Sequence, residues 1–230
     1  MQEFLSATRY CDIDSPGLAD VRRHLLTNRQ DPVDRAITLF EFVRDNVRYM
    51  FSPWDVRASE TLVTCEGMCT NKSNLLVALL RGCGIPAAYG VLHVNPREYY
   101  GVVAPEFLKP LVSDRSVHIY AAAFLNDHWI RCDPSTDADI AAKTAHFCRQ
   151  TQLIRWDGRQ DALDFLQPQH VWADAGLHAN VDALLDKSAR HALPTTLEML
   201  NRFVRFIRDQ PPFAGPLELT TAYLQRRKET

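Results

Sequence analysis

The sequence predicts a mixed fold in which a helix that begins with a cysteine is followed by antiparallel strands and then by a helical C-terminal part. Three observations support this prediction. Apolar residues repeat at helical spacing over residues 69–83, and Gly84 and Pro86 end that helix. Two apolar runs on either side of a short polar turn have the pattern of a β-hairpin. Beyond the hairpin, the composition becomes more polar and helical.

Composition restricts the class of protein. The chain has 230 residues, of which 46% are hydrophobic and 23% charged, which is typical of a soluble globular protein with a sizeable core. The net charge of −2 gives no strong field for nucleic acid or an anionic membrane. Apolar runs are too short to cross a bilayer, and the N-terminus lacks the pattern of a signal peptide. We therefore expect a cytoplasmic protein that binds neither membrane nor nucleic acid.

Before the cysteine, the sequence predicts a short amphipathic helix, a core helix, an extended segment and a loop, at residues 18–26, 31–47, 47–51 and 52–67. Asp31 and Pro32 are typical of the N-cap and first position of a helix. Trp54 lies in the loop that leads to the cysteine. Its position alone makes it a candidate substrate-binding residue.

The helix from Cys69 carries the candidate nucleophile. Cys69, Ser73, Leu76 and Leu80 follow one another at steps of four, three and four, so Cys69 is expected to face the core. A thiol at a helix N-terminus has its thiolate favoured by the helix dipole and by unpaired N–H groups. The neighbouring polar residues, among them Lys72, are expected on a solvated helix face, although they could also tune the thiol or bind substrate.

After this helix, the sequence predicts a strand at 87–94, a long irregular stretch at 95–116 and a hairpin. The irregular stretch is a candidate lid or specificity loop, because loops of this length in a compact domain are usually functional. The hairpin strands, 117–125 and 128–132, flank Asn126-Asp127. With an even-numbered loop centred there, three side chains share one face of the sheet and a carboxylate lies within reach of an imidazole. These residues are His118, Tyr120 and Asp133.

The C-terminal part is predicted to be a helical extension. Residues 153–156 could form a last strand, and helices are expected near 159–167 and 178–191. A further helix opens at Thr195 and stops before Pro211-Pro212.

Six cysteines are expected to be free thiols in a reducing compartment: Cys11, Cys65, Cys69, Cys83, Cys132 and Cys148. Cys65 and Cys69 have a spacing that could start a zinc site, but no second close Cys or His pair completes it. We expect no metal and no cofactor. Cys65 is the rival thiol, but it sits in the predicted loop and lacks the helix end.

Cys69, His118 and Asp133 together supply what a thiol nucleophile needs. An imidazole can take the thiol proton and later give it to a leaving amine. A carboxylate on the other ring nitrogen fixes the tautomer and supports the imidazolium. The backbone N–H of Cys69 is a natural oxyanion donor. His93 and His128 also occupy strand positions, but no motif surrounds them.

Three separated motifs resemble the transglutaminase-like superfamily. They are Gly67-x-Cys69, the helix end ALLRGCGIPA at 78–87, and a strand led by His118 followed by Trp129-x-x-x-Asp133-Pro134. The resemblance covers about residues 31–140. It implies a papain-like α+β fold, with the nucleophile helix packed on an antiparallel sheet that carries His and Asp. Together with the composition, it predicts a transglutaminase-like catalytic core with N-terminal helices at 1–145; residues 146–230, which fall outside the resemblance, are predicted from their composition to be a helical extension packed on that core.

The resemblance implies a cysteine-dependent acyl transfer through a Cys-His-Asp triad and a thioester acyl-enzyme. The substrate would be a peptide, a protein or a small amide or thioester, and hydrolysis and transamidation both stay open. Two alternatives remain: a catalytically silent peptide-binding module with the same fold, and an amide-forming tailoring enzyme of small-molecule biosynthesis. No acidic loop has the spacing of an EF-hand, so the calcium dependence of some family members is not expected here. Tyr120, like Trp54, is a weaker candidate for substrate binding.

Overall fold

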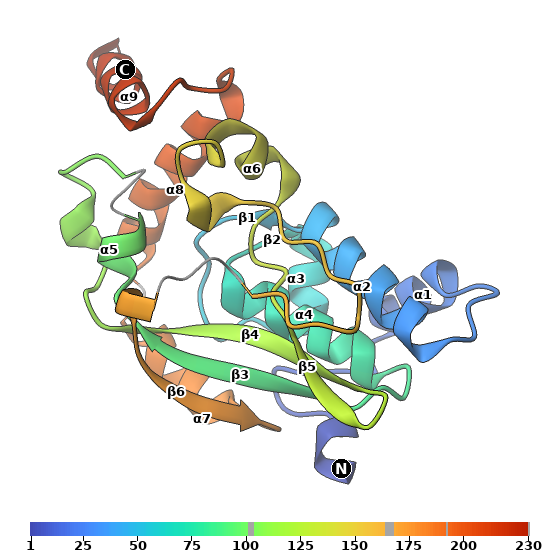
Figure 1. Ribbon diagram of the computed structural model, residues 1–230. Coiled ribbons are helices and arrows are strands. Elements are labelled where there is room, and N and C mark those ends of the chain that lie inside the picture. The colour runs from blue at the N-terminus through green and yellow to red at the C-terminus, as the bar shows by residue number, and fades with distance from the viewer. Residues whose placement is uncertain (101–103, 164–167, 192, 230) are drawn as a thin grey trace.

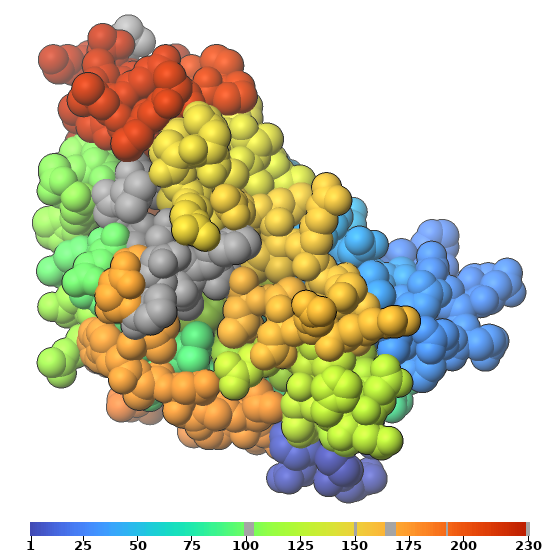
Figure 2. Space-filling model, viewed as in Figure 1, coloured from blue at the N-terminus to red at the C-terminus, as the bar shows by residue number. Residues whose placement is uncertain are grey.

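The computed structural model describes residues 1–100, 104–163, 168–191 and 193–229. Its centre is an antiparallel four-stranded sheet in the order β5-β4-β3-β6, with the helices of the N-terminal half stacked on one face (Figure 1). The α+β prediction is confirmed. The two termini lie at opposite ends of the molecule, as the ribbon and the space-filling view both show (Figures 1 and 2).

Four helices form the N-terminal half, and three of them pack against the fourth, α4, which begins with Cys69. They are α1 (Pro16–Leu25), α2 (Pro32–Asn46), α3 (Ala58–Thr64) and α4 (Cys69–Arg81). Asp31 caps α2 by accepting a hydrogen bond from the N–H of Asp34, as its position predicted. The prediction that 52–67 is a loop is wrong in its second half, where α3 forms. Glu60 reaches back to the N–H of Arg57 and so stabilises the first turn of α3.

The strands agree with the predicted hairpin. The main sheet contains β3 (Ala87–Val94), β4 (Ser116–Leu125), β5 (His128–Cys132) and β6 (Val171–His178), and β1 (Arg48–Tyr49) pairs in parallel with β2 (Glu66–Gly67). Leu125 pairs with His128, so the loop has two residues. Asn126 and Asp127 both have positive φ, of 50° and 66°, which is typical of a type I′ hairpin turn.

The C-terminal half is less purely helical than predicted. It contains α6 (Ala138–Thr144), α7 (Asp182–Ala189), α8 (Pro194–Asp209) and α9 (Pro216–Glu229), while α5 (Pro96–Tyr100) lies in the long segment before β4. Residues 153–156 do not form the expected strand, and residues 159–163 are not helical. The rest of that predicted helix, 164–167, lies outside the described residues. The edge strand β6 was not predicted, and it joins the sheet of the N-terminal half.

Two hydrophobic clusters hold these parts together. The larger one lies between α2, α4 and one face of the sheet, and it includes Phe40, Leu76 and Ile119. The second joins α8 and α9 to α6 and to the segment before β4; its buried residues are Met50, Leu108, Ile140, Cys148, Phe203, Val204, Phe206, Ile207, Phe213, Leu219 and Tyr223. In the space-filling view α9 (red) and α6 (yellow) lie together at one end (Figure 2). The division at residue 145 stays a prediction.

Candidate active site

Cys69 is the first residue of α4 and is 8% exposed. The turn before it is set by Asn71, whose Oδ1 accepts the N–H of Met68 and whose Nδ2 donates to the carbonyl of Pro53. Gly67 is required because a Cβ there would lie 2.7 Å from the Cβ of Asn71. The Gly-x-Cys motif therefore has a packing reason: it lets the chain pass close to the first turn of the helix and fixes where the thiol points.

The polar residues of α4 are buried, and the expectation of a solvated helix face is wrong. Lys72 is fully buried and donates to the carbonyls of Arg44 and Val47, which are carbonyls at the end of α2. Burial lowers the pKa of Lys72 to about 7. Ser73 donates to the carbonyl of Ile119 on β4. These bonds fix the nucleophile helix to its neighbours through backbone atoms.

His118 lies on β4 and reaches a carboxylate at the end of β5. Ala121 pairs with Cys132, so the register places Tyr120 opposite Asp133 and His118 on the diagonal. Nε2 of His118 lies 2.7 Å from Oδ2 of Asp133, and the two side chains are 3% and 0% exposed. The even-numbered loop is thus confirmed, and with it the proximity that the hairpin parity predicted.

The second oxygen of Asp133 is also occupied. Oδ1 accepts the backbone N–H of Ser135 at 3.0 Å and the hydroxyl of the same residue. Burial alone would raise the pKa of Asp133, but His118 and Ser135 hold it below its ordinary value. The carboxylate is therefore charged and fixed in orientation.

Two neighbouring side chains favour the protonated imidazole. Burial alone would lower the pKa of His118, but Asp133 and Cys69, by their charges and by hydrogen bonds, raise it well above its ordinary value. Since Nε2 faces Asp133, Nδ1 is the ring nitrogen left for the thiol. The structure thus brings all three predicted residues together, in an arrangement suited to a thiolate beside an imidazolium.

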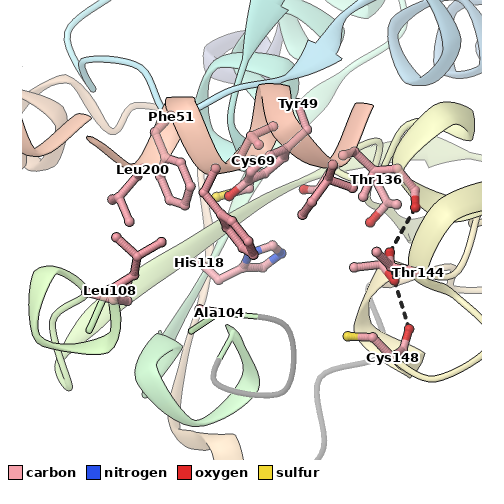
Figure 3. A pocket seen from close by; sticks show the side chains of 17 residues that line it. Tyr49, Phe51, Cys69, Ala104, Leu108, His118, Thr136, Thr144, Cys148 and Leu200 are labelled. Carbon is pink, nitrogen blue, oxygen red and sulfur yellow. Dashed lines mark hydrogen bonds between the residues drawn. The ribbon is translucent and has the colours of Figure 1, made fainter. Parts of the chain in front are cut away.

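Behind Cys69 lies an inner cavity of about 80 Å³, which Figure 3 shows from close by. Cys69 and His118 form part of its wall, with Phe51 and Leu200 on one side and Thr136 and Thr144 on the other (Figure 3). Most of the wall is apolar and comes from α6, α8 and the segment before β4. The further lining residues are Tyr49, Ala104, Leu108, Val112, Ser135, Ile140, Cys148, Thr151, Phe203, Val204 and Ile207.

In front of Cys69 lies an outer groove of about 790 Å³. Trp54 lines this groove together with Cys69, so its predicted position beside the thiol agrees with the structure. Tyr120 lines neither the groove nor the inner cavity. It is fully buried and packs over Gly90, where a Cβ would lie 1.9 Å from the ring. Tyr120 therefore fills the sheet, and its role in substrate binding stays a prediction without support from either cavity.

The other candidate thiols and imidazoles lie elsewhere. All six cysteines are free, and Cys65 is exposed at the end of α3. His93 lines the outer groove, whereas His128 is exposed at the hairpin turn. Among the described residues, no group of three or more His, Cys, Asp or Glu side chains is placed to hold a metal ion.

Sequence reasoning missed the apolar residues that α8 contributes to the inner cavity. Leu200, Phe203, Val204 and Ile207 repeat at helical spacing, so an apolar face was visible. That pattern shows that a face is buried but not what it is buried against. No signal in the sequence connects this face to Cys69.

A family model agrees with this geometry. The model of the transglutaminase-like superfamily matches residues 19–134, which is half of the chain and includes Cys69, His118 and Asp133. The chain belongs to the transglutaminase-like superfamily. The match ends before α8, so the family pattern does not extend to the helix that lines the inner cavity.

Comparison with one solved structure supports the same fold, and a second likeness is weaker. A candidate cysteine protease from Cytophaga hutchinsonii shares 18% identity and a TM-score of 0.51, over 79% of this chain and 48% of the other. This chain thus spans about half the length of the Cytophaga protein. A candidate protease from Parabacteroides distasonis shares 9% identity and a TM-score of 0.39, over 68% of this chain and 30% of the other. No curated protein matches the sequence.

In the part of the chain that the structure describes, no helix combines the length and apolarity needed to cross a bilayer.

Proposed function

We propose that this member of the transglutaminase-like superfamily is a cysteine-dependent enzyme of acyl transfer. The observation that carries the proposal is the buried His118–Asp133 pair, which Ser135 supports and which lies beside Cys69 in the wall of one cavity. Each group has the partner that its role requires, and the thiol stands where an outer groove meets an inner cavity. The substrate class is an amide, a peptide or a thioester.

The proposed reaction has two halves. The Cys69 thiolate attacks the carbonyl carbon, a carbon–sulfur bond forms, and the bond to the leaving group breaks as the His118 imidazolium donates its proton to that group. Water or an amine then attacks the thioester while His118 takes a proton from it, and the thiolate leaves. Water gives hydrolysis, and an amine gives transamidation.

During both halves of the reaction, the negative charge that develops on the carbonyl oxygen needs hydrogen-bond donors. The backbone N–H of Cys69 opens α4, and the first N–H groups of a helix have no acceptor within the helix. The N–H of Met68, the residue before it, is already bound to Asn71. We therefore assign the N–H of Cys69 as one oxyanion donor.

Two other functions are compatible with the fold. A silent peptide-binding module would need the groove but not the triad, and the burial of an ion pair beside a thiol has no purpose in such a module. An amide-forming tailoring enzyme would use the same acyl-enzyme and differ only in the acceptor. The triad favours acyl transfer over the silent module and leaves the acceptor open.

Alkylation by iodoacetamide tests the proposal without a known substrate. Exposure alone would make Cys65 react first, because Cys65 is exposed and Cys69 is 8% exposed. If Cys69 is an activated nucleophile, peptide mapping by mass spectrometry will show that it reacts before Cys65. His118→Ala should slow the labelling of Cys69 and leave that of Cys65 unchanged.

Once a substrate is found, Cys69→Ala should reduce kcat/KM by at least about 10³-fold, and the control Cys65→Ala should have no effect. Labelling of Cys69 at the rate of Cys65 or slower, or activity that survives in Cys69→Ala, contradicts the proposal.

A further inference from the structure

We propose that the inner cavity is the acyl pocket of this enzyme and that it takes a short aliphatic group attached to the carbonyl that Cys69 attacks. This inference rests on the proposed function and adds the substrate class to it. Both reacting side chains, Cys69 and His118, lie in the cavity wall. A carbonyl carbon held at the sulfur can therefore place one substituent in the cavity and the other in the outer groove.

The wall opposite the thiol is apolar. Leu200, Phe203, Val204 and Ile207 form one face of α8, and Leu108 and Ile140 continue that surface from neighbouring segments. A charged or strongly polar substituent would lose its hydration there without receiving a partner. An aliphatic substituent would bury its surface.

The polar groups of the wall are already paired with one another. The hydroxyl of Thr144 bonds the carbonyl of Ile140 and the hydroxyl of Thr151, and Thr151 in turn bonds the carbonyl of Cys148. In the described residues, none of the buried side-chain nitrogen or oxygen atoms that lack a partner belongs to a residue that lines this cavity. The buried side-chain polar atoms of the wall therefore need no hydrogen bond from a ligand.

The cavity volume limits the size of the acyl group. At about 80 Å³ it exceeds several-fold the space that one water needs, and it is about half of the roughly 150 Å³ in which an apolar cavity holds benzene. An unbranched chain of about three to four carbons fits this space, whereas a long acyl chain does not.

The position of α8 is fixed by hydrogen bonds at its middle and near its C-terminal end. Asn201 exchanges two hydrogen bonds of 2.8 Å with the backbone of Phe51. Arg208 binds Asp137 and the carbonyl of Tyr49, and the same Asp137 accepts the N–H of Tyr49. The segment that leads to the Cys69 loop and the helix that forms the pocket wall are thus tied together. This is the arrangement of a built site and not of a packing gap between independent parts.

Chloromethyl ketones of increasing length test the proposal directly. In these probes, R–CO–CH₂Cl, the thiolate displaces chloride from the methylene carbon, and R is a straight chain of one to eight carbons. The rate of Cys69 labelling, followed by peptide mass, should rise about fourfold per carbon, which corresponds to about 0.8 kcal/mol per buried methylene. The rise should end at about four carbons, and longer chains should react more slowly.

Two variants of α8 should move this optimum in opposite directions. Val204→Phe fills the cavity and should shift the optimum to one or two carbons, and Ile207→Ala enlarges it and should shift the optimum to longer chains. Met199→Ala is the matched control, because Met199 lies on the same helix but is exposed. Thermal unfolding of each variant confirms that it is folded at the assay temperature.

The outcomes separate this inference from the proposed function. If Cys69 reacts with iodoacetamide in a His118-dependent way but shows no chain-length optimum, or an optimum that neither variant moves, the acyl pocket is refuted and the nucleophile stands. If the optimum moves as expected while His118→Ala leaves labelling unchanged, the pocket stands and the triad is refuted. Failure of every ketone to label Cys69 also overturns the pocket.

Discussion

The substitution Asp133→Asn separates the role of charge from that of shape in the candidate triad. Asparagine has nearly the same size, and its amide oxygen can accept the backbone N–H of Ser135 as Oδ1 of the aspartate does. That bond fixes the amide, because rotation would point the NH₂ group at another donor. The NH₂ group must then face Nε2 of His118 and donate to it. The imidazole proton is forced onto Nδ1, the nitrogen that should receive the thiol proton, so the base is in the wrong tautomer.

The wrong tautomer sets the expected magnitude. In a Ser-His-Asp triad, the same Asp-to-Asn change keeps the geometry but lowers kcat by about 10⁴-fold, so we expect kcat/KM to fall by about 10³- to 10⁴-fold. His118 is 3% exposed and Asp133 0% exposed, so loss of the buried charge should also lower the stability of the fold, by about 3–5 kcal/mol. Burial lowers the pKa of His118 and Asp133 raises it, so loss of the carboxylate moves the alkaline limb of the pH profile to lower pH.

The assay is the pH dependence of Cys69 alkylation, followed by kcat/KM when a substrate is known. Circular dichroism of each variant distinguishes loss of the fold from loss of activation of the Cys69 thiol. Asp161→Asn is the control, because Asp161 is an exposed carboxylate at the edge of β5 that pairs with Arg131. A folded Asp133→Asn protein with the alkylation rate and pH profile of the wild type would show that the carboxylate does not support the imidazole.

Two further predictions concern the nucleophile helix. Gly67→Ala should lower the melting temperature and slow the alkylation of Cys69 by iodoacetamide, because the added Cβ would lie 2.7 Å from the Cβ of Asn71. An unchanged alkylation rate would show that this turn does not determine the orientation of the thiol. Burial lowers the pKa of Lys72 from 10.5 to about 7, so between these pH values the unfolded chain binds the extra proton and stability rises with pH. In urea titrations the free energy of unfolding of the wild type should rise by up to about 1.4 kcal/mol per pH unit more than that of Lys72→Met over that range, and equal slopes would contradict the lowered pKa of Lys72.

The sequence was sufficient to select the three candidate residues because each stands in a local signal and the three signals together resemble one family. Cys69 opens a helix whose stripe and stop are both visible, and the parity of the Asn126-Asp127 hairpin determines which side chains share a face. Such signals depend on neighbours within a few residues. The geometry that joins His118 to Asp133 follows from a two-residue loop and therefore did not need knowledge of the tertiary structure.

Features that depend on distant partners were missed. In the sequence, Lys72 has the pattern of a surface residue on a helix. The carbonyls that it binds belong to the end of α2, and no local sequence pattern predicts these contacts. The strand β6 is an edge strand with mostly exposed residues, so it lacks the alternation of polar and apolar residues that reveals a strand. Its partner, β3, lies far away in the sequence.

Under the proposed function, the layout of this chain would allow one catalytic core to serve different acyl groups. The thiol, the imidazole and the carboxylate lie on α4, β4 and the end of β5, all within the segment that the family model matches. Four residues of the cavity wall lie on α8, outside that segment, and α8 is held by side chains of its own, Asn201 and Arg208. Substitutions at Val204 or Ile207 can therefore change the shape of the pocket without moving any group of the triad. Under the proposed function, part of the acyl selectivity is thus encoded outside the segment that carries the candidate triad, so a change in selectivity requires no change in those three residues.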